Sequence, residues 1–137
     1  FTREGERFEK IRKLLEVTDL VMLDIKHIDD EQHKILTGQT NRNILDMARY
    51  LDEIGKPMWI RHVLVPERSD KDEYLIRLDA FIQSLHNVQK VEVLPYHTLG
   101  AYKWKELGYE YPLEGIDPPT QERIKNANQL LHTGARV

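Results

Sequence analysis

Hydrophobic residues follow two different spacings along this chain. Short, nearly continuous apolar runs occupy residues 19–25, 58–65 and 88–94. Such runs are typical of strands buried on both faces of a parallel sheet. Around them, apolar residues recur every three or four positions, which predicts helices with one buried face. The helices predicted in this way cover residues 8–15, 43–54, 74–85 and 117–133. The polar segment 27–40 could also hold a short helix over residues 30–37.

Several residues predict where these helices begin and end. Asn43 is expected to cap the third helix, because its side chain can accept a hydrogen bond from the first turn. Gly38 and Gly55 are expected to follow the ends of the second and third helices, where glycine is common. Residues 117–119, Asp-Pro-Pro, are expected to start the last helix, and Gly134 to stop it.

Strands and helices alternate in the predicted order, which is typical of right-handed βαβ crossovers and a parallel sheet. Three strands are too few to close a barrel, so both sheet edges should be unpaired. Residues 98–115 are expected to form a long irregular loop that contains several aromatic side chains. Such a loop can act as a lid or bind a ligand, or its aromatic rings can fix it to its own domain. We therefore expect an α/β fold in one domain over residues 1–137, equivalent to half of a larger α/β protein.

Composition narrows the class of protein. The chain has 137 residues, a net charge of -3 and no cysteine. A slightly acidic chain lacks the positive charge that proteins use to bind nucleic acid. No apolar run approaches the ~18 residues that a membrane-spanning helix needs. Without cysteine, this chain can supply no disulfide, zinc–thiolate or iron–sulfur ligand.

Polar residues at the ends of the predicted strands are the candidate site, because ligands bind at the carboxyl ends of parallel strands. Asp24 and Lys26 flank Ile25 and should share one face, either toward a ligand or as a mutual ion pair. Arg61 lies inside the second strand, where it needs a ligand anion or a structural carboxylate. His97 follows the third strand and is either a ligand-binding or a structural histidine.

The remaining histidines are weaker candidates. His62 should face away from Arg61 and pack under a helix, because neighbouring residues of a strand point to opposite faces. His27 and His33 have no spacing that matches a known metal site. Residues 29–31, Asp-Asp-Glu, are most simply interpreted as a solvated helix start.

Three segments in order resemble a known family: residues 21–26 (Val-Met-Leu-Asp-Ile-Lys), 59–61 (Trp-Ile-Arg) and 94–97 (Leu-Pro-Tyr-His). They are similar to the carboxyl-terminal half of the pyruvate formate-lyase activating enzymes, which are radical S-adenosylmethionine (SAM) glycyl-radical activases. The similarity also includes residues 14–20 and 103–119. Each segment alone is unspecific, and the weight comes from all of them in order at matching spacing.

The resemblance implies a fold, cofactors and partners. It implies a partial (β/α)6 TIM-like barrel that holds SAM and a 4Fe-4S cluster. The cluster cleaves SAM, and the resulting 5′-deoxyadenosyl radical takes hydrogen from a glycine of pyruvate formate-lyase in anaerobic glucose metabolism. A flavodoxin-type electron donor and a cytoplasmic location are implied as well. Carried over by position, the SAM site would include Asp24, Ile25, Lys26, Arg61 and His97. Asp24 and the Met22 carbonyl would hold a monovalent cation.

One departure from the family is large. The family's three cluster cysteines, spaced CxxxCxxC, have no counterpart here, nor does its glycine-rich SAM segment. We therefore expect a fragment that is inactive alone and binds SAM poorly, with the radical chemistry belonging to a full-length parent. Its unpaired sheet edges should favour self-association.

Three other functions stay open. The parent could activate a different glycyl-radical enzyme, since target choice depends on surface contacts. The chain could instead be a stand-alone interaction module. It could also be a cluster-free barrel enzyme that uses Lys26 as a Schiff-base amine.

Overall fold

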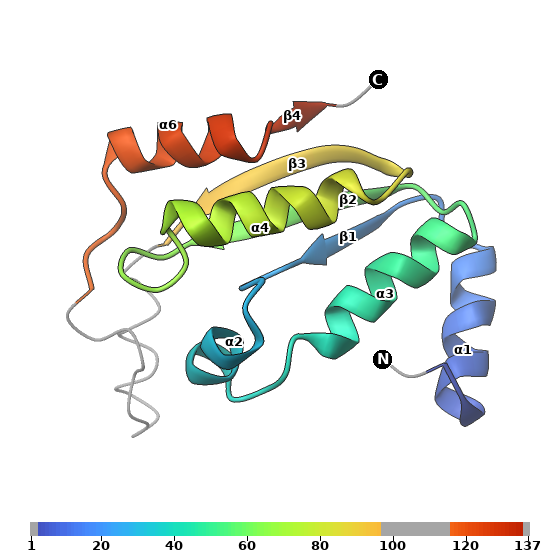
Figure 1. Ribbon diagram of the computed structural model, residues 1–137. Helices are drawn as coiled ribbons and strands as arrows, with labels where there is room; N and C mark the ends of the chain where they lie inside the picture. Colours follow the sequence, from blue (N-terminus) through green and yellow to red (C-terminus); the bar gives the residue numbers. More distant parts are fainter. Residues whose placement is uncertain (1–2, 97–115, 136–137) are drawn as a thin grey trace.

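The computed structural model describes residues 3–96 and 116–135 (Figure 1). His97 and the expected 98–115 loop therefore lie outside the described residues. The elements, in chain order, are α1 (Gly5–Glu16), β1 (Val21–Asp24), α2 (Asp30–Thr37), α3 (Arg42–Glu53), β2 (Met58–Leu64), α4 (Asp72–Gln83), β3 (Val88–Pro95), α6 (Gln121–Leu130) and β4 (Gly134–Ala135). Among the described residues, no helix is long and apolar enough to span a bilayer.

One sheet runs through the molecule in the order β1-β2-β3-β4. Strands β1, β2 and β3 are parallel, which confirms the predicted α/β fold with three parallel strands. The short β4 pairs antiparallel with β3 through Lys90↔Ala135 and Val91↔Gly134. The expectation that both edges are unpaired is therefore wrong at β3, where the chain returns after α6. Among the described residues, β1 pairs on one side only.

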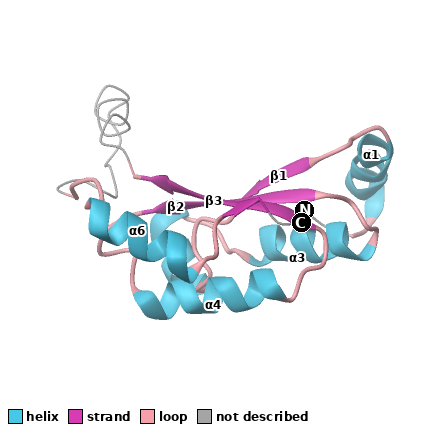
Figure 2. Ribbon diagram, turned by 90° about the horizontal axis from the view of Figure 1, so that it is seen from above, coloured by secondary structure: helices cyan, strands magenta, loops and turns pink. Residues whose placement is uncertain are grey.

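Helices α3, α4 and α6 cover one face of the sheet (Figure 2). Along β2 the buried residues Met58, Ile60, His62 and Leu64 alternate with half-buried ones, which include Trp59 and Arg61. The expectation of strands buried on both faces is therefore wrong for the described residues. The core lies between the helices and one face, and we call the other side, which bears Asp24, Trp59, Arg61, Lys90 and Glu92, the open face.

Two of the expected helix starts are wrong. Asn41 rather than Asn43 precedes α3, and its side chain donates to the carbonyl oxygens of His27 (3.2 Å) and Ile28 (2.8 Å). Helix α6 begins at Gln121, because Thr120 accepts a hydrogen bond from the Arg123 N–H at 3.2 Å and the two prolines before it stay outside the helix. The expected ends of α2 at Gly38 and of α3 before Gly55 are confirmed.

Candidate functional site

The carboxyl end of β1 and the middle of β2 bring opposite charges together on the open face. In the strand register Asp24 lies opposite Arg61, and both side chains are about one-third exposed. Arg61 Nε donates to Asp24 Oδ1 at 2.7 Å, and Nη2 donates to Oδ2 at 3.2 Å. This two-point pair with Asp24 raises the pKa of Arg61 above its usual value. Arg61 therefore has the structural carboxylate that its position in a strand required.

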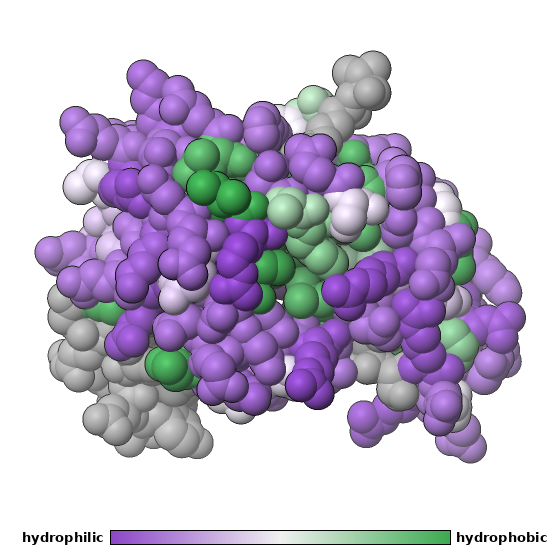
Figure 3. Space-filling view, viewed as in Figure 1, coloured by the Kyte–Doolittle hydropathy of each residue, from purple (hydrophilic) through white to green (hydrophobic). Residues whose placement is uncertain are grey.

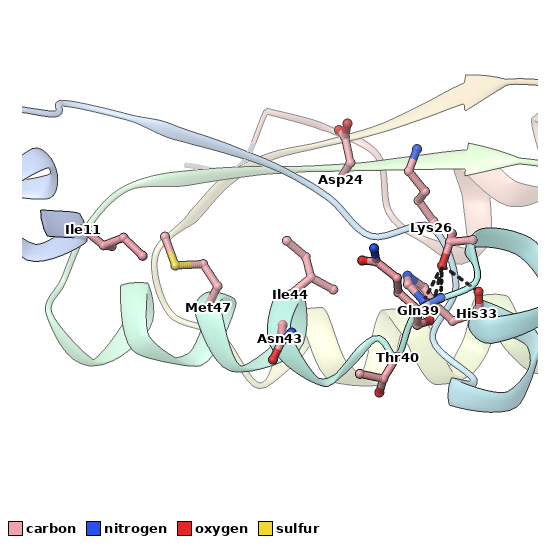
Figure 4. A pocket seen from close by; sticks show the side chains of 10 residues that line it. Ile11, Asp24, Lys26, His33, Gln39, Thr40, Asn43, Ile44 and Met47 are labelled. Carbon is pink, nitrogen blue, oxygen red and sulfur yellow. Dashed lines mark hydrogen bonds between the residues drawn. The ribbon is translucent and has the colours of Figure 1, made fainter. Parts of the chain in front are cut away.

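Lys26 lies beyond the end of β1 and is exposed. Asp24 and Lys26 project to the same side of the chain, as the alternation of side chains predicted (Figure 4). Asp24 pairs with Arg61 and not with Lys26, so the alternative of a mutual Asp24–Lys26 ion pair is wrong. Among the described residues, Lys26 has no ion-pair partner.

A cavity of about 570 Å³ lies beside β1 and α3. Ile11, Ile44 and Met47 line it with apolar groups, and Asp24, Lys26 and His33 are among its polar lining residues (Figure 4). A site of this size, with several apolar walls and a few charged groups, can hold a small amphipathic ligand.

Ile25 contributes only its main chain to this surface. Its side chain is fully buried in the core, on the face opposite Asp24. Its N–H donates to the Arg61 carbonyl at 2.9 Å, and its carbonyl accepts from His62 Nδ1 at 2.7 Å. Ile25 therefore anchors the strand end from which the Asp24 and Lys26 side chains project.

Two buried histidines support the same segment. His62 is buried on the face opposite Arg61, as predicted, and burial lowers its pKa to about 4. His27 Nε2 donates to the Arg68 carbonyl at 2.8 Å, and its Nδ1 accepts from the Asp29 N–H at 3.0 Å. Burial also lowers the pKa of His27, which packs edge-on against Tyr74. Sequence reasoning missed the role of His27, because its partners are backbone groups of distant loops.

Residues 29–31 do begin a helix, but they are not simply solvated. Asp29 caps α2 by accepting from the Gln32 N–H, and it also pairs with Arg77 of α4 at 3.0 Å. Arg77 is the main reason that the pKa of Asp29 lies below its usual value. Among the described residues, no group of three or more histidines and carboxylates could hold a metal ion. The proposed cation site of Asp24 and the Met22 carbonyl stays a prediction.

Three parallel strands with charged residues on one face and helices on the other are consistent with part of an α/β barrel. The radical SAM superfamily profile matches residues 2–78, which is more than half of the chain. The chain belongs to the radical SAM superfamily.

Within that superfamily, the similar curated proteins carry one name. The chain is 57% identical over 133 residues to a pyruvate formate-lyase-activating enzyme of Streptococcus mutans, covering 97% of this chain and 51% of that protein. It is 53% identical over 135 residues to the enzyme of the same name from Listeria monocytogenes, covering 98% of this chain and 54% of that protein. The chain thus spans about half the length of the curated relatives it matches.

A solved structure supports the fold independently. A domain of the pyruvate-formate lyase-activating enzyme from Bacteroides vulgatus matches with a TM-score of 0.74 at 21% identity. The match covers 90% of this chain and 68% of that domain. At this identity the likeness concerns the fold alone, and it agrees with the partial barrel that the sequence motifs implied.

Proposed function

We propose that this chain forms part of the SAM site of a pyruvate formate-lyase-activating enzyme, with Asp24, Lys26 and Arg61 as ligand-binding residues. The observation that carries the proposal is that Asp24, at the carboxyl end of β1, pairs with Arg61 of β2 and lines the same cavity as Lys26. The 57% identity to a protein of that name supports the choice of reaction.

The charges suit the amino-acid end of SAM, which carries an ammonium and a carboxylate. Asp24 would accept hydrogen bonds from the ammonium, while Lys26 and Arg61 would donate to the carboxylate. The Ile25 main chain, His97 and a monovalent cation at Asp24 and the Met22 carbonyl complete the proposed site. The chain has no cysteine, so it cannot ligate the 4Fe-4S cluster that the superfamily implies.

The remaining features belong to the whole protein. Bound next to the cluster, SAM would supply the radical that takes hydrogen from a glycine of pyruvate formate-lyase. We further propose a flavodoxin-type electron donor and the cytoplasm as the compartment, both on the resemblance to the activase family.

Lys26 offers the most direct test of SAM binding. Titrating SAM into the chain, followed by NMR, should shift the signals of residues near Asp24 and Lys26. Lys26→Met should weaken this binding about tenfold, the typical effect of losing one hydrogen bond to a charged group. The exposed Lys125 of α6 provides the control, and Lys125→Met should leave the affinity unchanged. Weak binding is expected of this chain, and an NMR titration detects it. An equal loss in both variants, or no shift of these signals at any SAM concentration, would exclude the proposed site.

We also propose that a second copy covers the unpaired edge of β1. Leu14 is 63% exposed, Val17 is 81% exposed and Met22 is 55% exposed, and all three lie near this strand. Hydrophobic side chains gather around β1 in the space-filling view (Figure 3). Unpaired strand edges beside apolar surface favour association. Sedimentation should therefore show a mass that rises with concentration, and a monomer at all concentrations would contradict this.

A further inference from the structure

Arg61 lies between two carboxylates on the open face. The strand register places it opposite Asp24 of β1 on one side and opposite Glu92 of β3 on the other. Neighbouring strands are about 4.8 Å apart, so a long side chain on the central strand can reach either neighbour. The guanidinium therefore has two acceptors within range, one in each direction.

The structure shows one distribution of these charges. Arg61 makes its two hydrogen bonds to Asp24, while Glu92 Oε1 pairs with Lys90 Nζ at 2.6 Å. Lys90 Nζ also lies 4.8 Å from the centre of the Trp59 ring. Since Lys90 has this aromatic ring as a second partner, it does not depend on Glu92 alone.

In this arrangement both oxygens of the Asp24 carboxylate accept hydrogen bonds from Arg61, so a cationic ligand group competes with Arg61 for this carboxylate. A half-buried guanidinium that loses its partner is costly unless another acceptor is near. We propose that Glu92 is a second acceptor for Arg61, so that Arg61 moves from Asp24 to Glu92 when a ligand ammonium binds Asp24. The guanidinium has five N–H donors, so those that do not bond to Glu92 can still donate to the ligand carboxylate. Glu92 is then a positioning residue that acts through Arg61 and does not itself touch the ligand.

The transfer of Arg61 can be tested without any ligand. Asp24→Asn removes the charge of the first acceptor and one of its two acceptor oxygens. NMR reports how fast the guanidinium protons of Arg61 exchange with water. We expect slow exchange in the wild-type chain and in Asp24→Asn, because Glu92 receives the guanidinium. In the double variant Asp24→Asn/Glu92→Gln, exchange should become fast. Fast exchange in Asp24→Asn alone or in the wild-type chain would overturn the proposal, and so would slow exchange in the double variant.

A second experiment measures the effect of Glu92 on ligand binding. It uses SAM as the ligand and therefore rests on the proposed function. Glu92→Gln should weaken SAM binding about tenfold, because Arg61 then stays on Asp24. In the Arg61→Met background the same substitution should have no effect, and Glu73→Gln on the exposed start of α4 serves as the control. Equal weakening in both backgrounds would show that Glu92 acts independently of Arg61 and would overturn the inference. Absence of SAM binding to the wild-type chain would reject the proposed function, and the exchange experiment would still decide whether Arg61 moves.

Discussion

Replacing Ile25 by alanine should lower the free energy of unfolding by about 2–5 kcal/mol, the usual range for truncating a fully buried isoleucine. Ile25 is completely buried in the main core, and its main-chain groups bond to Arg61 and His62 on β2. Truncation removes the packing beneath the strand end while leaving both neighbouring charged side chains in the chain. Urea unfolding followed by circular dichroism would measure the change.

The adjacent residue provides a matched control. Lys26→Ala removes an exposed side chain one position further along and should change the free energy of unfolding by less than about 0.5 kcal/mol. The two variants should therefore separate stability from binding: Ile25→Ala unfolds the chain more easily, whereas Lys26→Ala weakens SAM binding. If Ile25→Ala were no more destabilising than Lys26→Ala, the conclusion that the Ile25 side chain is buried in the core would be wrong.

The spacing of apolar residues predicted most of the helices and strands, because each of these elements is formed by residues that are close in sequence. The apolar runs at 58–65 and 88–94 became β2 and β3, and the spacing of apolar residues identified α1, α3 and α4. Strand β4 has no such pattern, since Gly134 and Ala135 pair with β3 only because α6 returns the chain to that edge. Its pairing depends on tertiary structure that two small residues do not encode.

The difference between local and long-range contacts also explains which features of the candidate site the sequence predicted. Alternation along one strand predicted that Arg61 and His62 face opposite ways, and the structure confirms this. The pairing of Arg61 with Asp24 joins residues 37 positions apart and depends on the register between β1 and β2. The position of Glu92 opposite Arg61 likewise depends on the register between β2 and β3. A pattern within one segment does not encode the register between two strands.

Acidification should destabilise the chain through His62. Burial is the main cause that lowers its pKa from the ordinary 6.5 to about 4 in the folded protein. The unfolded chain therefore takes up this proton first as the pH falls. The stability that depends on neutral His62 is complete above about pH 6.5 and is lost progressively toward pH 4. A shift of this size corresponds to roughly 3 kcal/mol, and the lowered pKa of His27 acts in the same direction.

Urea unfolding at a series of pH values between neutrality and pH 4 would measure this loss. His62→Gln removes the titrating group, so it should lower stability at neutral pH and flatten the dependence on pH. His86, whose side chain is 85% exposed, provides the control, and His86→Gln should keep most of the wild-type slope. An unchanged slope in His62→Gln would mean that the loss arises elsewhere. A flattened slope would show that the strand end beneath Asp24 and Lys26 depends on a neutral histidine, because His62 donates to the carbonyl of Ile25 between them.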